Sequence, residues 1–141
     1  MSDANLAKPP VGVGHMSLTV ADVAISNRFY ATFGLRIVGK GDDMSILELR
    51  GGTHLLLFQR GGGSADVDSP FEQAAPGVID LMIEGRTFEE LDAYRTALIA
   101  GGVHPDPIPN KRYFGHYIFK ARDPDGNEVT VSTSHASDLP V

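Results

Sequence analysis

The chain contains no cysteine, which excludes disulfides, a thiolate nucleophile and metal sites with thiolate ligands. No apolar run approaches the ~20 residues that a membrane-spanning helix needs, and the first ten residues, MSDANLAKPP, lack the apolar segment of a signal peptide. No cluster of basic residues occurs, and the net charge of −6 argues against nucleic acid as a partner. These absences predict a cytoplasmic protein that binds neither membranes nor nucleic acid.

The 141 residues suffice for one domain, or for two small modules that share a core. Composition changes mark the boundaries, since residues 61–76 combine a run of glycines with acidic residues and prolines. We therefore predict five segments: a flexible lead over residues 1–11, a first module over 12–60, a connecting loop over 61–76, a second module over 77–134 and a tail over 135–141.

The first module begins with a predicted strand over residues 11–20 and continues with a helix over 23–33. Asp22 is suited to cap the start of that helix, and Gly34 to end it. Ile25, Phe29 and Phe33 recur every fourth residue and predict its buried stripe. Three further strands are predicted, over residues 35–40, 44–49 and 54–59.

The second module repeats this order. A strand over residues 77–84 precedes a helix that Thr87 and Glu90 begin with capping-box spacing. Residues 103–108 contain Pro105 and Pro107, which restrict them to an edge strand or an irregular segment. The last strands are predicted over residues 113–121 and 128–133, joined by the turn Asp123-Pro124-Asp125-Gly126-Asn127.

The chain thus reads as one strand–helix–strand–strand–strand unit used twice. Each unit is too small to cover its own sheet. We predict an α+β fold in which two βαβββ modules lie side by side and form a curved mixed sheet, with outer helices and an inner cleft.

This order and several motifs resemble the vicinal oxygen chelate superfamily, which includes glyoxalases, bleomycin-resistance proteins and extradiol dioxygenases. The matching segments are GHMSLTV at residues 14–20, RFY at 28–30, FGL at 33–35 and DPDGN at 123–127. The resemblance covers residues 12–134 and implies the paired-module fold. It also implies a small organic molecule as the partner and a homodimer as the assembly.

Catalytic members of that superfamily hold a divalent metal through a histidine on the first strand of one module, a histidine or glutamate on the first strand of the other, and a glutamate on a closing strand. The resemblance places His15 at the first of these positions. It places Val78 and Thr130 at the other two, and Leu56 at the closing-strand position of the first module. A single imidazole does not hold a catalytic divalent ion, so the usual metal site is not expected.

Strand alternation predicts further polar residues on the cleft face. Asp80 lies in an apolar strand, where a carboxylate is costly unless it is paired, and with His15 it is our candidate for acid–base catalysis. The candidates for ligand binding are Ser17, His54, Tyr113, His116, Tyr117 and Thr130, of which the tyrosines are suited to stack on a planar compound. A displaced metal site would use His15, His54, Asp80 and Glu128.

Three functions follow from these residues. The first is a metal-independent protein that binds or transforms an organic compound in the cleft. If it transforms the compound, His15 and Asp80 are the catalytic pair. Another is a metal-dependent lyase, isomerase or dioxygenase that uses the displaced ligands. The third is a non-catalytic domain that binds a partner protein.

Overall fold

The computed structural model describes Pro10, residues 12–61 and residues 77–134. Apart from Pro10 and Gly61, the predicted lead, connecting loop and tail lie outside these described residues. Within the described part of the chain, no helix is both long and apolar enough to cross a membrane.

The first module forms a four-stranded mixed sheet and one helix. Its elements are β1 (His15–Val20), α1 (Val23–Thr32), β2 (Arg36–Lys40), β3 (Met44–Glu48), a short 3-10 turn (Arg50–Gly52) and β4 (His54–Gln59). The strand order is β1-β4-β3-β2, with β1 parallel to β4 and the other neighbours antiparallel. Edge strand β1 therefore lies next to the last strand of its own module.

The ends of α1 are as predicted, and its buried face is as predicted only in part. Asp22 caps the helix, since its Oδ1 accepts hydrogen bonds from the backbone N–H groups of Ala24 (2.9 Å) and Ile25 (3.2 Å). Gly34 follows the helix with φ of 99°, which glycine adopts without strain. Of the expected apolar stripe, Phe33 is buried and Phe29 packs against the core, but Ile25 is 43% exposed. The buried positions within the helix are Val23, Ser26, Asn27 and Tyr30.

The second module forms a three-stranded sheet in the order β5-β7-β6. Its elements are β5 (Val78–Met82), α2 (Phe88–Ala100), β6 (Ile118–Arg122) and β7 (Glu128–Ser132). The predicted capping box is present at Thr87 and Glu90. Residues 103–108 form no strand; Asp106 N–H donates to the Lys120 carbonyl (2.7 Å), and the prolines on either side of Asp106 have no N–H to extend this pairing.

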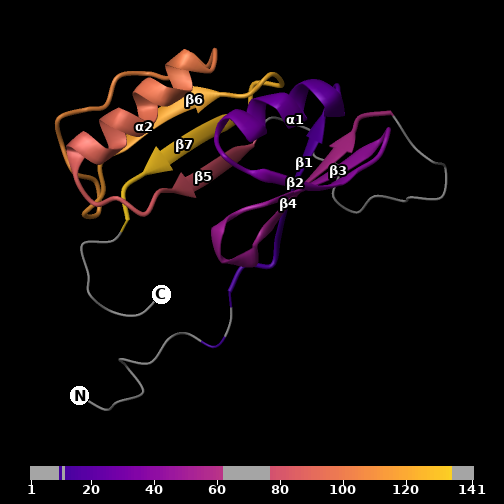
Figure 1. The fold of residues 1–141 in the computed structure, drawn as a ribbon, viewed down its shortest axis with the longest axis horizontal. Helices are drawn as coiled ribbons and strands as arrows, with labels where there is room; N and C mark the ends of the chain where they lie inside the picture. Colours follow the sequence, from indigo (N-terminus) through magenta and orange to yellow (C-terminus); the bar gives the residue numbers. More distant parts are fainter. Residues whose placement is uncertain (1–9, 11, 62–76, 135–141) are drawn as a thin grey trace.

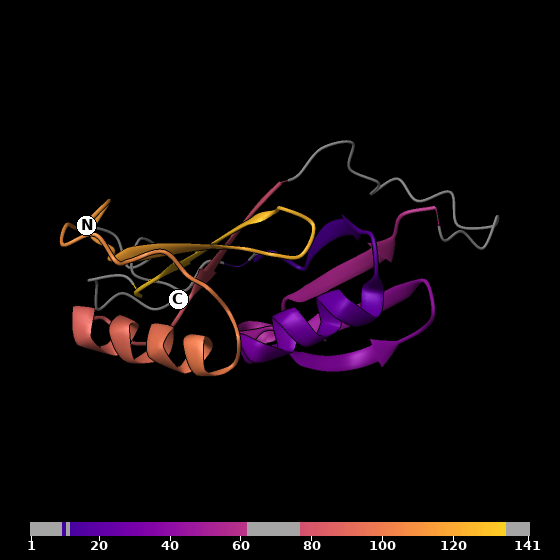
Figure 2. The ribbon, with the colours of Figure 1, turned by 90° about the horizontal axis from the view of Figure 1, so that it is seen from above.

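The two modules lie side by side, with both helices on the same side of the molecule (Figures 1 and 2). Buried residues from both modules form one hydrophobic core, which includes Leu47 and Leu57 from the first and Leu91 and Phe119 from the second. The α+β fold with paired modules is confirmed, and its strands fall into two hydrogen-bonded sheets.

Direct contacts join the modules at two places. Tyr30 Oη on α1 donates a hydrogen bond of 2.6 Å to Asp123 Oδ2 in the turn between β6 and β7. Asp125 in the same turn accepts from the Ala21 N–H at 2.7 Å. Nearer the cavity described below, Tyr94 Oη on α2 donates to the Phe33 carbonyl at 2.6 Å. These contacts set the position of one sheet relative to the other.

Candidate functional site

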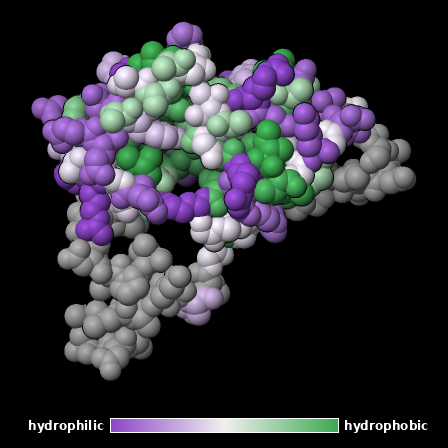
Figure 3. Space-filling view, viewed as in Figure 1, coloured by the Kyte–Doolittle hydropathy of each residue, from purple (hydrophilic) through white to green (hydrophobic). Residues whose placement is uncertain are grey.

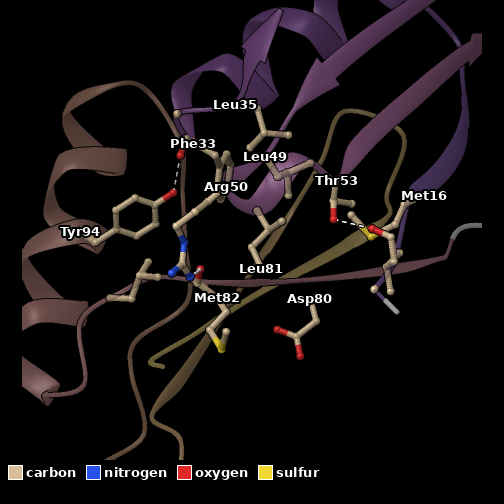
Figure 4. A pocket seen from close by; sticks show the side chains of 14 residues that line it. Met16, Phe33, Leu35, Leu49, Arg50, Thr53, Asp80, Leu81, Met82 and Tyr94 are labelled. Carbon is tan, nitrogen blue, oxygen red and sulfur yellow. Dashed lines mark hydrogen bonds between the residues drawn. The ribbon is translucent and has the colours of Figure 1, made fainter. Parts of the chain in front are cut away.

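A cavity of about 820 Å³ lies where the modules meet. The first module contributes the start of β1, the turn after α1 and the turn after β3, and the second contributes β5 and α2 (Figure 4). Its apolar wall includes Met16, Leu35, Leu49 and Leu81. In the space-filling view, apolar residues gather beside a recess in the middle of the molecule, with hydrophilic residues around them (Figure 3).

Backbone carbonyls hold Arg50, Thr53 and Tyr94, three of the polar side chains that line this cavity. Arg50 Nη2 donates to the Met82 carbonyl at 3.2 Å, and Arg50 Nη1 lies 3.5 Å from Glu84 Oε1. Thr53 Oγ1 donates to the Val13 carbonyl at 2.6 Å. Burial raises the pKa of Tyr94 to about 12, so its hydroxyl stays a neutral donor at physiological pH. The cavity therefore has an ordered polar rim that bridges both modules.

Asp80 lies at the open side of this cavity. It points to the same side of β5 as Met82, whereas Leu81 points to the core (Figure 4). The apolar surroundings expected for Asp80 are absent, because Ile79 and Leu81 face the other side of the strand and Asp80 is exposed. Its carboxylate receives a long hydrogen bond of 3.4 Å from Ser132 Oγ.

The structure brings His15 and His54 together on the first sheet, away from Asp80's sheet. They are direct neighbours on β1 and β4, and their ring centroids are 5.5 Å apart. His54 Nε2 lies 3.4 Å from Glu48 Oε2 on β3, and Glu48 pairs with Arg36 on β2. Hydrogen bonds from Arg36 and then His54 lower the pKa of Glu48 and keep it anionic. One row of polar side chains thus crosses all four strands.

On the second sheet, Thr130 and Glu128 occupy β7 beside β5. Thr130 Oγ1 donates to the Ile79 carbonyl at 3.3 Å. Glu128 Oε1 lies 3.3 Å from Lys120 Nζ and 4.0 Å from Arg122 Nη1. Ser17 is half-buried on the same face of the first sheet as His15. None of these contacts reaches the 820 Å³ cavity.

A smaller cavity of about 340 Å³ adjoins Asp80. Asp80, Met82, Tyr113, Phe114, His116 and Ser132 line it. His116 Nδ1 donates to the Thr133 carbonyl at 2.6 Å, which orients the imidazole ring. Tyr117 instead packs against the core, with its ring 5.4 Å from that of Phe88 in an edge-to-face contact. The fold therefore brings together Asp80, Tyr113 and His116 as a second group of predicted site residues, separate from His15 and His54 on the first sheet.

The residues at the superfamily's usual metal positions do not fit a metal. Val78 has no donor atom, and the Thr130 hydroxyl bonds to the Ile79 carbonyl. The displaced set is divided, because His15 and His54 lie on the first sheet while Asp80 and Glu128 lie on the second. Among the described residues, no group of three or more histidine, cysteine, aspartate or glutamate side chains is placed to hold a metal ion.

Sequence reasoning missed Arg50 and Tyr94 of the large cavity, and Glu48 beside His54. The position of Glu48 beside His54 could have been predicted from the sequence, since a hairpin with its turn at Arg50–Gly52 pairs residue 48 with residue 54. Arg50 and Tyr94 gave no local signal, because they acquire their role only when the modules pack together.

Comparisons with known proteins agree with this architecture. A model of the Glyoxalase/Bleomycin resistance protein/Dioxygenase superfamily matches residues 12–131. A lactoylglutathione lyase from Agrobacterium tumefaciens is similar in structure, with a TM-score of 0.73 and 26% identity over 90% of this chain and 96% of that one. An integron cassette protein from the mobile metagenome of V. cholerae has a TM-score of 0.70 and 26% identity over 90% of this chain and 98% of that one. No curated protein matches the chain at a meaningful level.

Proposed function

Since the chain belongs to the Glyoxalase/Bleomycin resistance protein/Dioxygenase superfamily, we propose that it binds a small organic molecule in the cavity between its modules. The observation that carries this proposal is the cavity of about 820 Å³ itself, which lies in the size range of small-molecule sites. A ligand with an apolar body fits the wall formed by Met16, Leu49 and Leu81, and a polar group on it would meet Arg50 or Asp80.

Binding without a superfamily metal is favoured by the donor set. Val78 and Thr130 do not supply the two metal ligands that would be needed beside His15. The donor set therefore does not favour the lyase activity for which the Agrobacterium protein is named. Homodimer formation and a cytoplasmic location stay predictions.

Binding is testable with N-phenyl-1-naphthylamine, a neutral dye whose fluorescence rises in apolar surroundings. Leu49→Trp should weaken its binding at least about tenfold, because the indole would occupy the cavity. Val38→Trp is the matched control, since Val38 is 49% exposed on β2 and does not line the cavity. Equal dye affinity in wild type and both variants would place the site elsewhere.

Acid–base chemistry is a second candidate function, and the contact between His54 and Glu48 favours it. A carboxylate that accepts a hydrogen bond from an imidazole holds the ring in one orientation, as a group that transfers protons requires. The His15 ring lies beside it, with its centroid 5.5 Å from that of His54. His54→Gln should bind a turned-over substrate within about threefold of wild type, yet convert it at least about 100-fold more slowly. An unchanged rate would remove His54 from the mechanism.

A further inference from the structure

Phe114 combines two unfavourable features at one position. Its φ of 50° lies in the left-handed region, which side chains other than glycine, asparagine and aspartate rarely adopt. Its side chain is also 102% exposed, although transfer of a phenyl ring out of water is favourable. Packing against the other described residues offsets neither feature. Strain of this kind persists where the surrounding structure enforces it and commonly marks a functional position.

The neighbouring residues enforce this conformation. Tyr113 and His116 exchange backbone hydrogen bonds of 2.8 and 2.9 Å and close a tight turn around Phe114 and Gly115. Arg112 Nη1 donates to the Gly115 carbonyl at 2.7 Å. The hydrogen bond from His116 Nδ1 to the Thr133 carbonyl fastens the same turn to the end of β7. The turn therefore holds the backbone of Phe114 in place, with its ring in solvent.

That place is the rim of the 340 Å³ cavity. Tyr113 and Phe114 supply its aromatic surface, and Met82 and Ile118 add apolar area. The exposed carboxylate of Asp80 also lines it and accepts a long hydrogen bond of 3.4 Å from the Ser132 hydroxyl, which carries no opposing charge. Tyr113 and His116 are the other titratable residues of the lining.

The basic residues near this turn contact its aromatic rings or a neighbouring carboxylate, and a cation that stacks on Tyr113 would displace Lys111 or use the opposite face of the ring. Lys111 Nζ lies 5.1 Å from the centroid of the Tyr113 ring, and Arg112 lies 4.5 Å from that of Tyr117. Lys120 pairs with Glu128. It also lines a neighbouring cavity, which Tyr113 and Phe114 line as well. The aromatic rings of this region thus already attract cations from within the chain.

We propose that this cavity binds a planar organic cation, which stacks on Phe114 and Tyr113 and places its charge against Asp80. Aromatic faces and a carboxylate both favour cations over neutral or anionic compounds of the same shape. The inference rests on the proposed function, because Asp80 lines both the 820 Å³ and the 340 Å³ cavity. It adds the class of ligand that Asp80 and the aromatic rings favour.

Two planar dyes test this inference: proflavine, a tricyclic cation at neutral pH, and acridine, its neutral ring analogue. Wild-type protein should bind proflavine at least about tenfold tighter than acridine. Asp80→Asn should abolish that preference by weakening proflavine binding about tenfold and leaving acridine binding unchanged. Asp92→Asn removes the same charge from an exposed position on α2 and should change neither affinity.

Phe114→Gly provides an independent arm, because glycine accepts the positive φ and removes only an exposed ring. This variant should melt no lower than wild type and bind both dyes at least about fivefold more weakly. Equal affinity for the two dyes, or equal effects of Asp80→Asn and Asp92→Asn, would overturn the inference. The proposed function fails separately, if Leu49→Trp leaves N-phenyl-1-naphthylamine binding unchanged.

Discussion

Replacing Asp123 with alanine is expected to lower the free energy of unfolding by about 3–5 kcal/mol, a large part of the stability of an ordinary domain. The Asp123 side chain is 5% exposed. Its Oδ2 accepts from the Tyr30 hydroxyl at 2.6 Å and from the Asn127 side-chain amide at 2.8 Å. Its Oδ1 accepts from the N–H groups of Asp125 (2.9 Å) and Asn127 (2.8 Å). Alanine would leave these buried donors without an acceptor.

Urea unfolding of Asp123→Ala measures this loss, with Asp125→Ala as the matched control. Asp125 lies in the same turn and accepts from the Ala21 N–H and the Ser26 hydroxyl, but it is only half-buried. We expect about 1 kcal/mol for Asp125→Ala. Similar losses in the two variants would mean that burial of Asp123 does not anchor the junction between the modules.

The turn around Asp123 shows which structural features the local sequence can predict and which it cannot. Its aspartates, proline, glycine and asparagine predicted a hairpin, and β6 and β7 confirm it. The partner of Asp123 is Tyr30, which is 93 positions away, and no local pattern names it. The same contact explains the error in α1, because Tyr30 and Asn27 enter the core while Ile25 faces solvent.

The candidate site likewise has features that the local sequence predicts and features that depend on how the modules pack. Alternation within β1 and β5 placed His15 and Asp80 on the faces opposite the core, since a side chain's face depends only on its own strand. The cavities depend on how the two sheets pack, which contacts such as Tyr94 to Phe33 and Arg50 to Met82 determine. The conformation of Phe114 could not be predicted, because a left-handed phenylalanine has no signature in a run of residues.

Those inter-module contacts also predict steep loss of stability in alkali. Burial, followed by the hydrogen bond and charge of Asp123, raises the pKa of Tyr30 far above its ordinary value of 10.0. Burial raises the pKa of Tyr94 to about 12. Below pH 10 both tyrosines are neutral in the folded and the unfolded chain, so their contribution to the free energy of unfolding is fully present. Above it the unfolded chain loses protons that the folded chain keeps, and unfolding becomes easier.

Each tyrosine should lower the free energy of unfolding by about 1.4 kcal/mol per pH unit in this range. Between pH 10 and about 12 the pair should therefore remove roughly 5 kcal/mol, after which the contribution of Tyr94 ends. Urea unfolding at successive pH values measures the slope. Tyr94→Phe should lower stability by about 1 kcal/mol at neutral pH, through its lost hydrogen bond to Phe33, and should make the slope shallower by about 1.4 kcal/mol per pH unit. Other titrating groups act equally in both proteins, so an unchanged slope would show that the Tyr94 hydroxyl is not kept neutral by the fold.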